Sequence, residues 1–62
     1  MNNTQRVRNK EIRELIAKRG LKHYEVASAL GINQFTFSHW LQLELPQEKQ
    51  AEIIRVIRGI EL

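Results

Sequence analysis

The sequence has 62 residues, 42% of them hydrophobic, and no cysteine. From this length we expect a single domain, and the lack of cysteine excludes a disulfide framework and a zinc site built on thiolates. Its net charge of +3 is uneven: residues 1–22 carry seven basic and two acidic side chains, whereas 23–62 carry three basic and five acidic ones. This asymmetry fits a chain that presents one face to a polyanion, with ordinary solvated helix surface as the alternative.

The first predicted elements are an arm and a helix. Residues 1–8 are polar and basic with one apolar residue, so we expect a flexible N-terminal arm. Asn9 suits an N-cap, and apolar residues at positions 12, 15 and 16 predict a helix over 9–19, ended by a left-handed Gly20. No apolar stretch approaches the roughly 20 residues that cross a bilayer, so we expect a soluble, cytoplasmic protein without membrane contact.

Two short helices follow, predicted over 23–30 and 34–42. Gly31 should end the first, and Asn33 should cap the second by accepting a hydrogen bond from a backbone N–H. The side chains expected to face the core are Val26, Ala27, Leu30, Phe37, Trp40 and Leu41. Those expected to face outward are Phe35, His39 and Gln42, with Ser38 on their flank.

A fourth helix is predicted over 46–58, with Pro46 in its first turn. Its apolar stripe is wider than one small core usually uses, so part of it is expected to form a homodimer interface. The residues assigned to that interface are Ile53, Ile57, Ile60 and Leu62. The alternative is that they all close the core of a single chain. Together the elements predict an all-α, compact four-helix domain over 9–62.

The segment HYEVASALGINQFTFSHWLQ, residues 23–42, has the features that two steeply crossing short helices need. Ala27 is small where the backbones approach, Gly31 tolerates positive φ in the turn, and apolar residues lock the helices together. These locking residues are Val26, Ile32, Phe37 and Trp40. The pattern resembles the helix-turn-helix of the lambda Cro and phage repressor class, and the flanking helices extend the resemblance over most of 9–60.

This resemblance implies a lambda repressor-like fold and sequence-specific binding of double-stranded DNA by a transcriptional regulator. It further implies a repressor of phage or mobile-element type, with the helix over 34–42 as a recognition helix in the major groove. A homodimer would read two half-sites about 34 Å apart. A helical bundle with the same packing and another use remains the alternative.

The resemblance also implies which residues touch DNA. The base contacts would be Gln34, Phe35, Ser38 and His39. Gln34 can bond adenine through N6 and N7, and His39 can donate to guanine unless it is simply a solvated histidine. Phe35 departs from the polar residue typical of that position in the class. It would touch a thymine methyl group or wedge at a base step, or else make a protein contact.

The cations that neutralise phosphates must come from outside the helix over 34–42, because this segment has no lysine or arginine. The residues assigned to the DNA backbone are Lys22, His23, Tyr24, Asn33, Thr36, Arg6 and Arg8. Lys10 and Arg13 are further candidates, whereas Lys18 and Arg19 are expected to be solvated surface charges. So few cations predict that a single copy binds weakly.

An enzyme is not expected, because His23 and His39 have no cysteine or aspartate beside them and no phosphate-cradling glycine loop accompanies them. No cofactor, metal or small-molecule ligand is expected either. The rival function is a protein-interaction module of the same fold, such as an antirepressor or accessory regulator. It would bind another protein through Phe35 and the apolar stripe of the helix over 46–58.

Overall fold

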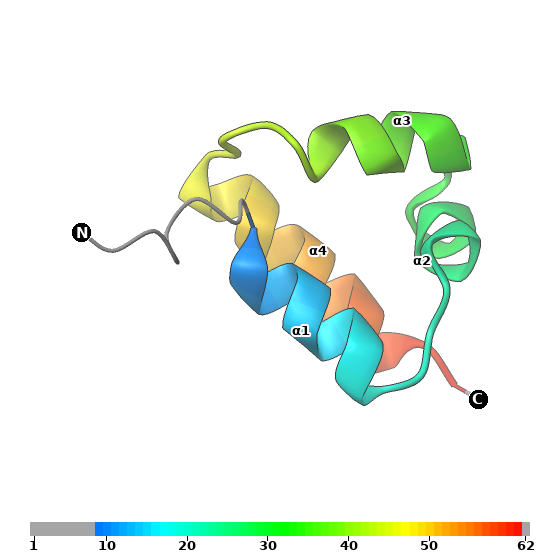
Figure 1. Cartoon of the computed structure of the whole chain (residues 1–62). Coiled ribbons are helices and arrows are strands. Elements are labelled where there is room, and N and C mark those ends of the chain that lie inside the picture. Colours follow the sequence, from blue (N-terminus) through cyan, green and yellow to red (C-terminus); the bar gives the residue numbers. More distant parts are fainter. Residues whose placement is uncertain (1–8, 62) are drawn as a thin grey trace.

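The computed structural model describes residues 9–61 and contains four helices, with no strand in that range (Figure 1). They are α1 (Lys10–Lys18), α2 (His23–Leu30), α3 (Gln34–Trp40) and α4 (Gln47–Gly59). The all-α prediction is confirmed. The predicted arm, with Arg6 and Arg8, and the terminal Leu62 lie outside the described residues. None of the four helices has both the length and the apolar character needed to cross a membrane.

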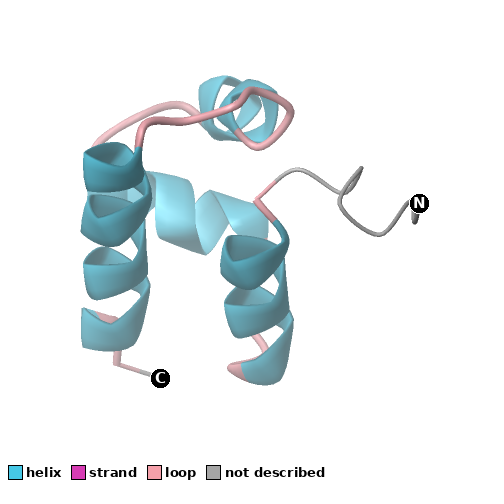
Figure 2. Ribbon diagram, turned by 90° about the vertical axis from the view of Figure 1, so that its left-hand side faces the viewer, coloured by secondary structure: helices cyan, strands magenta, loops and turns pink. Residues whose placement is uncertain are grey.

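The helices form two pairs around one core. Figures 1 and 2 show α1 and α4 side by side and running in the same direction, with α2 crossing behind them and α3 above. Direct contacts join α2 to α3 and both α1 and α2 to α4. The buried core consists of Ile12, Ile16, Leu21, Val26, Ala27, Phe37, Leu41, Ile53 and Ile57. Each of the four helices therefore contributes apolar side chains to this single core.

The residues predicted to form a dimer interface on α4 are mostly used inside the chain. Ile53 and Ile57 are completely buried, so their assignment to an intermolecular surface is wrong. They stand four residues apart on α4 and occupy the same core as Ile12 and Ile16 on α1. Ile60 is half-buried and packs against that core. A domain this small needs Ile53 and Ile57 to exclude water from its own interior.

Both α1 and α2 end as predicted, at a glycine in the left-handed region. Gly20 has φ 68° and Gly31 has φ 79°. After α2, the N–H of Ile32 donates to the carbonyl of Ala27 at 2.9 Å and the N–H of Gly31 donates to Ser28 at 3.0 Å. This is a Schellman motif, which satisfies the last carbonyls of α2 and turns the chain sharply into α3.

Asn9 does not act as the side-chain cap that its position predicts. It adopts a left-handed conformation, with φ 56°, and makes no capping hydrogen bond to α1. Its amide instead donates to the carbonyls of Leu41 at 3.0 Å and Leu43 at 2.9 Å, while Arg13 Nη2 donates to Leu41 at 3.1 Å. These side chains satisfy carbonyls left unpaired beyond α3, so α1 holds the carboxyl end of α3 in place.

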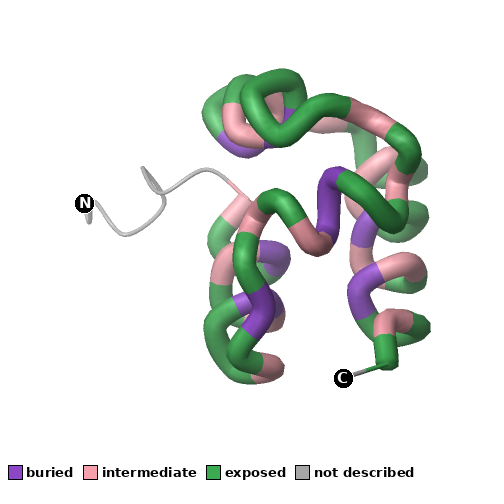
Figure 3. Tube along the Cα trace, turned by 90° about the vertical axis from the view of Figure 1, so that its right-hand side faces the viewer, coloured by how far each residue is buried: buried purple, intermediate pink, exposed green. Residues whose placement is uncertain are grey.

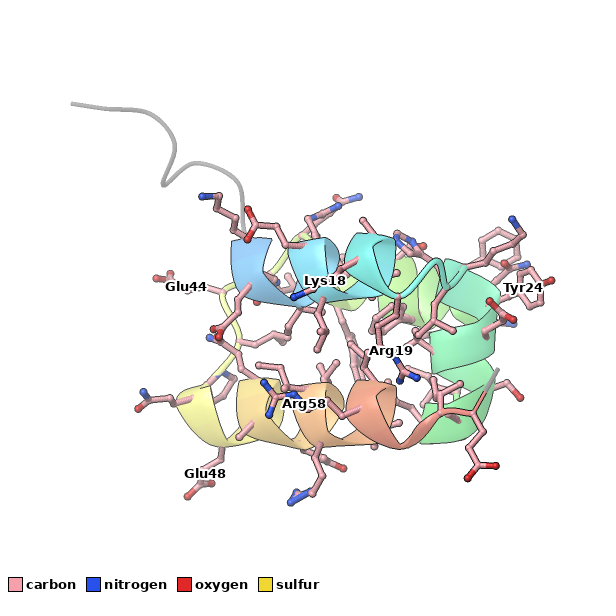
Figure 4. All side chains as sticks on the ribbon, turned by 90° about the horizontal axis from the view of Figure 1, so that it is seen from below. Lys18, Arg19, Tyr24, Glu44, Glu48 and Arg58 are labelled. Atoms are coloured by element: carbon pink, nitrogen blue, oxygen red, sulfur yellow. The ribbon has the colours of Figure 1, made fainter. Side chains whose placement is uncertain are left out.

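Arg19 likewise donates to carbonyls at the end of α4. This corrects the expectation that Arg19 is a solvated surface charge. Its guanidinium donates to the carbonyl of Ile57 and, at 2.8 Å, to that of Ile60 (Figure 4). A cation at the carboxyl end of a helix also interacts favourably with the helix dipole. Arg19 therefore joins the end of α1 to the end of α4.

Candidate nucleic-acid interface

The start of α3 is fixed by Asn33, as predicted. Asn33 has an extended backbone, with φ −72° and ψ 145°, and its Oδ1 accepts a hydrogen bond from the N–H of Phe35 at 2.6 Å. The bond satisfies one of the amides that every helix start leaves without a partner. It also sets the register of α3, so that the next residues leave the cap on the outer side.

The residues of α3 divide into an inner and an outer side. Phe37 is completely buried, whereas Gln34, Thr36 and His39 are exposed and Ser38 is half-buried. Phe35 is 75% exposed, the highest fraction among the large hydrophobic side chains. Figure 3 shows the outer side of α3 exposed and its buried position turned toward the rest of the fold. The predicted base-reading residues therefore lie on the accessible side of α3.

The end of α3 differs from the prediction by two residues. After Trp40, the N–H of Gln42 donates to His39 and that of Leu43 donates to Trp40, each at 2.9 Å. These three-residue bonds tighten the chain into a turn, so the α-helix does not reach position 42. Gln42 is nevertheless exposed, in agreement with its predicted outward position.

The start of α2 lies beside the middle of α3. The ring of His23 packs edge-on against the ring of Phe37, with centroids 5.7 Å apart. The imidazole of His23 is half-buried by this contact, and the DNA contact expected near His23 is through its backbone amide at the start of α2. Lys22 and Tyr24, on either side of His23, are exposed, with Tyr24 at 54%. The predicted backbone contacts Lys22 and Tyr24 are thus brought close to α3.

The side chain of Glu25 accepts a hydrogen bond from a backbone amide at the start of α2. Its Oε1 accepts a hydrogen bond from the backbone N–H of Lys22 at 2.7 Å. A glutamate three residues after the cap position is the spacing of a capping box, and this is the signal by which the sequence could have predicted the bond. The carboxylate reduces the attraction of this helix end for phosphate, so Lys22 itself must supply the positive charge.

Lys49 adds a cation beside α3 that the sequence did not predict. Its Nζ lies 5.0 Å from the centroid of the Trp40 ring and 3.2 Å from Oε1 of Glu52. A cation over an indole face is attracted by the ring electrons. Trp40 packs against the core, as predicted, but it is only half-buried, and Lys49 lies over its ring. No sequence pattern joins positions 40 and 49, because only the docking of α4 brings them together.

In the part of the chain that the structure describes, no group of three histidine, cysteine, aspartate or glutamate side chains could hold a metal ion. His23 and His39 do not share a site, because the first packs on the inner side of α3 and the second is exposed.

Comparison of this chain with protein families, with curated proteins and with solved structures finds no match. The candidate interface described above consists of α2, the turn at Gly31 and the outer side of α3.

Proposed function

We propose that α2 and α3 form a helix-turn-helix and that the chain binds double-stranded DNA in a sequence-specific manner. The observation that carries this proposal is the start of α3, where Gln34 and Phe35 are exposed beside the Asn33 cap while Phe37 locks the helix onto the core. A helix anchored on one side with polar groups on the other can enter the major groove. The regulator would then act as a transcriptional repressor of phage or mobile-element type.

Each exposed residue has a proposed role at the DNA. Gln34 would bond an adenine through its amide, and Phe35 would contact a thymine methyl group. His39 and Ser38 would complete the base contacts farther along α3. Lys22, Tyr24, Asn33 and Thr36, with the backbone amide of His23, would face phosphates and fix the position of α3. Among these residues Lys22 is the one permanent cation, so we expect modest affinity for one copy on one half-site.

A second candidate function is favoured by the two exposed aromatic side chains. Phe35 is 75% exposed and Tyr24 is 54% exposed, and large apolar groups on a surface are common in protein-binding patches. The chain would then bind another regulator as an antirepressor or accessory protein. Ile53 and Ile57 on the apolar stripe of α4 cannot take part in this protein contact, because they are buried in the core.

The test is selection of a randomised duplex pool by the purified chain, followed by binding of the selected site at several salt concentrations. Loss of Gln34 in Gln34→Ala should relax preference at one base pair by about 1 to 3 kcal/mol. Lys22→Ala should weaken all sequences alike and reduce the salt slope by about 1. Gln47→Ala, at the start of α4, is the matched control for Gln34→Ala. An unenriched pool, or binding that ignores salt, would favour the protein-interaction function.

A further inference from the structure

An open groove lies between α1 and α4. It faces the side seen in Figure 4, away from α3, which lies above these two helices in Figure 1. It is lined by Glu11, Glu14, Leu15, Lys18, Ile54 and Arg58. Asn9 and Arg13, which reach the carboxyl end of α3, lie on the opposite flank of α1, since successive helical residues turn by about 100°. The groove is therefore separate from the proposed DNA-binding surface, and the proposed function gives it no role.

The charges of this α1/α4 groove are sorted by sign along its length. The acidic pair, Glu11 and Glu14, lies toward the start of α1, whereas Lys18 ends the same helix. Because α1 and α4 run in the same direction, Arg58 in the last turn of α4 lies at the same end as Lys18. Figure 4 shows these two basic side chains in the gap between the helices. The groove thus has an acidic end, a basic end and no net charge.

The middle of the groove is apolar. Leu15 and Ile54 are both half-buried and pack against the core from opposite helices. Within residues 9–61, the charges around them are largely uncommitted: the only ion pair at the groove joins Lys10 to Glu14 at 3.5 Å, and none involves Glu11, Lys18 or Arg58. An apolar centre flanked by charges of opposite sign, three of them outside any ion pair in the described residues, is suited to a partner with the reverse arrangement of charge.

We propose that the partner is a second copy of this chain, docked groove to groove about a two-fold axis that lies in the plane of contact and crosses the groove from Leu15 to Ile54. Rotation about an axis across the groove reverses the direction of the groove, so the acidic end of one copy meets the basic end of the other twice. Leu15 and Ile54 of the two copies meet at the centre. The charge pattern of the groove is thus complementary to itself. A partner with charges of one sign, such as a nucleic acid, would attract one end of the groove and repel the other.

This dimer differs from a pair of copies that read one duplex side by side. Because the groove and α3 lie on opposite sides of each copy, the two α3 helices would face away from each other. If the proposed function holds, one dimer would join two separate DNA segments. The association itself involves no DNA, so it can fail or succeed independently of DNA binding.

The dimer is expected to be weak and sensitive to salt. Each copy contributes two half-buried apolar side chains, which places the contact below the roughly 1,200 Å² typical of stable complexes. Exposed ion pairs add little each and are screened by salt. Sedimentation velocity of the purified chain from roughly 10 µM to 1 mM covers the affinities expected for such contacts.

Two complementary charge reversals test the geometry. Glu11→Lys with Glu14→Lys makes the groove wholly basic, and Lys18→Glu with Arg58→Glu makes it wholly acidic. Each double variant alone should dissociate about tenfold or more readily than the original chain, and an equimolar mixture should associate again. Arg55→Glu, an exposed charge on α4 outside the groove, is the matched control and should dimerise normally.

Circular dichroism of each variant checks that the helices persist, because the reversals oppose the helix dipoles of α1 and α4. If a double variant unfolds, Glu14→Lys and Arg58→Glu replace it as single changes, and their mixture is measured in the same way. A chain that stays monomeric throughout the range overturns the proposal. So does a dimer that survives both reversals, or a mixture of folded variants that fails to associate.

Discussion

The side-chain oxygen of Asn33 accepts a hydrogen bond from the backbone amide of Phe35 at 2.6 Å, and this bond decides where α3 begins. Removing it in Asn33→Ala should lower the free energy of unfolding by about 1 kcal/mol, as for other helix N-caps. Asn33→Ser keeps an acceptor and should stay close to the original stability. Urea unfolding of the three proteins measures the difference, and equal stability of the alanine and serine variants would contradict the capping role.

Arg19 should matter for stability far more than its neighbour Lys18. Arg19→Ala removes the hydrogen bonds to the carbonyls of Ile57 and Ile60 and frees the end of α4. We expect a loss of about 1 to 3 kcal/mol, as for hydrogen bonds from charged donors. Lys18→Ala removes an exposed charge and should change stability by less than about 0.5 kcal/mol. Thermal unfolding distinguishes the two, and similar shifts would show that Arg19 is only a surface charge.

Asn9 combines a left-handed backbone with hydrogen bonds to the chain after α3, and two variants separate these contributions. Asn9→Gly loses the hydrogen bonds but accepts positive φ, whereas Asn9→Ala loses the bonds and carries backbone strain as well. The free energy of unfolding of the Asn9→Ala variant should therefore be about 1 kcal/mol lower than that of the Asn9→Gly variant. Chemical denaturation gives the order, and a more stable alanine variant would argue against the left-handed conformation.

The burial of Ile57 predicts a core defect that does not depend on protein concentration. Ile57→Val removes one methyl group from a completely buried side chain and should destabilise the chain by about 0.5 to 1.5 kcal/mol. Ile54→Val, at a half-buried position on the same helix, should have a smaller effect. Unfolding at two concentrations tests this. A stability loss for Ile57→Val that disappeared on dilution would restore Ile57 to an intermolecular interface.

Phe35 should affect recognition without affecting folding. Because its side chain is 75% exposed, Phe35→Ala should leave stability within about 0.5 kcal/mol of the original chain. On the proposed function, it should weaken binding to the selected DNA site. Replacing the contacted thymine by uracil removes the 5-methyl group and should weaken the original chain but not the variant. Equal losses for both proteins would place the methyl group against another residue.

The sequence could predict the four helices, the glycine ends of α1 and α2 and the cap of α3, because the information for these features is local. Gly31 and Asn33 act within a few residues of themselves, and helical spacing identifies Phe37 as buried. Asn9 and Arg19 could not be assigned in this way, since their hydrogen-bonding partners are 31 to 41 residues away. Their polar character allowed a local cap or a solvated charge, and only the docking of α1 against its neighbours selects the observed role.

The candidate site follows the same division. Outward placement of Gln34 and His39 depends on the phase of one helix, which the sequence specifies. The environment of Lys49 and the packing of His23 against Phe37 depend on contacts between helices. The width of the apolar stripe on α4 could not separate a dimer surface from a core, because both require the same residue types.

Trp40 is the chain's single tryptophan, half-buried near the end of α3 with the ammonium of Lys49 over its ring. Its intrinsic fluorescence therefore reports on one junction, between α3 and α4, without any label. Gln34 lies at the other end of α3, so emission should follow the docking of that helix rather than events at its tip. Trp40 fluorescence can therefore be used to measure the packing of α3 against α4 separately from ligand binding at the exposed start of α3.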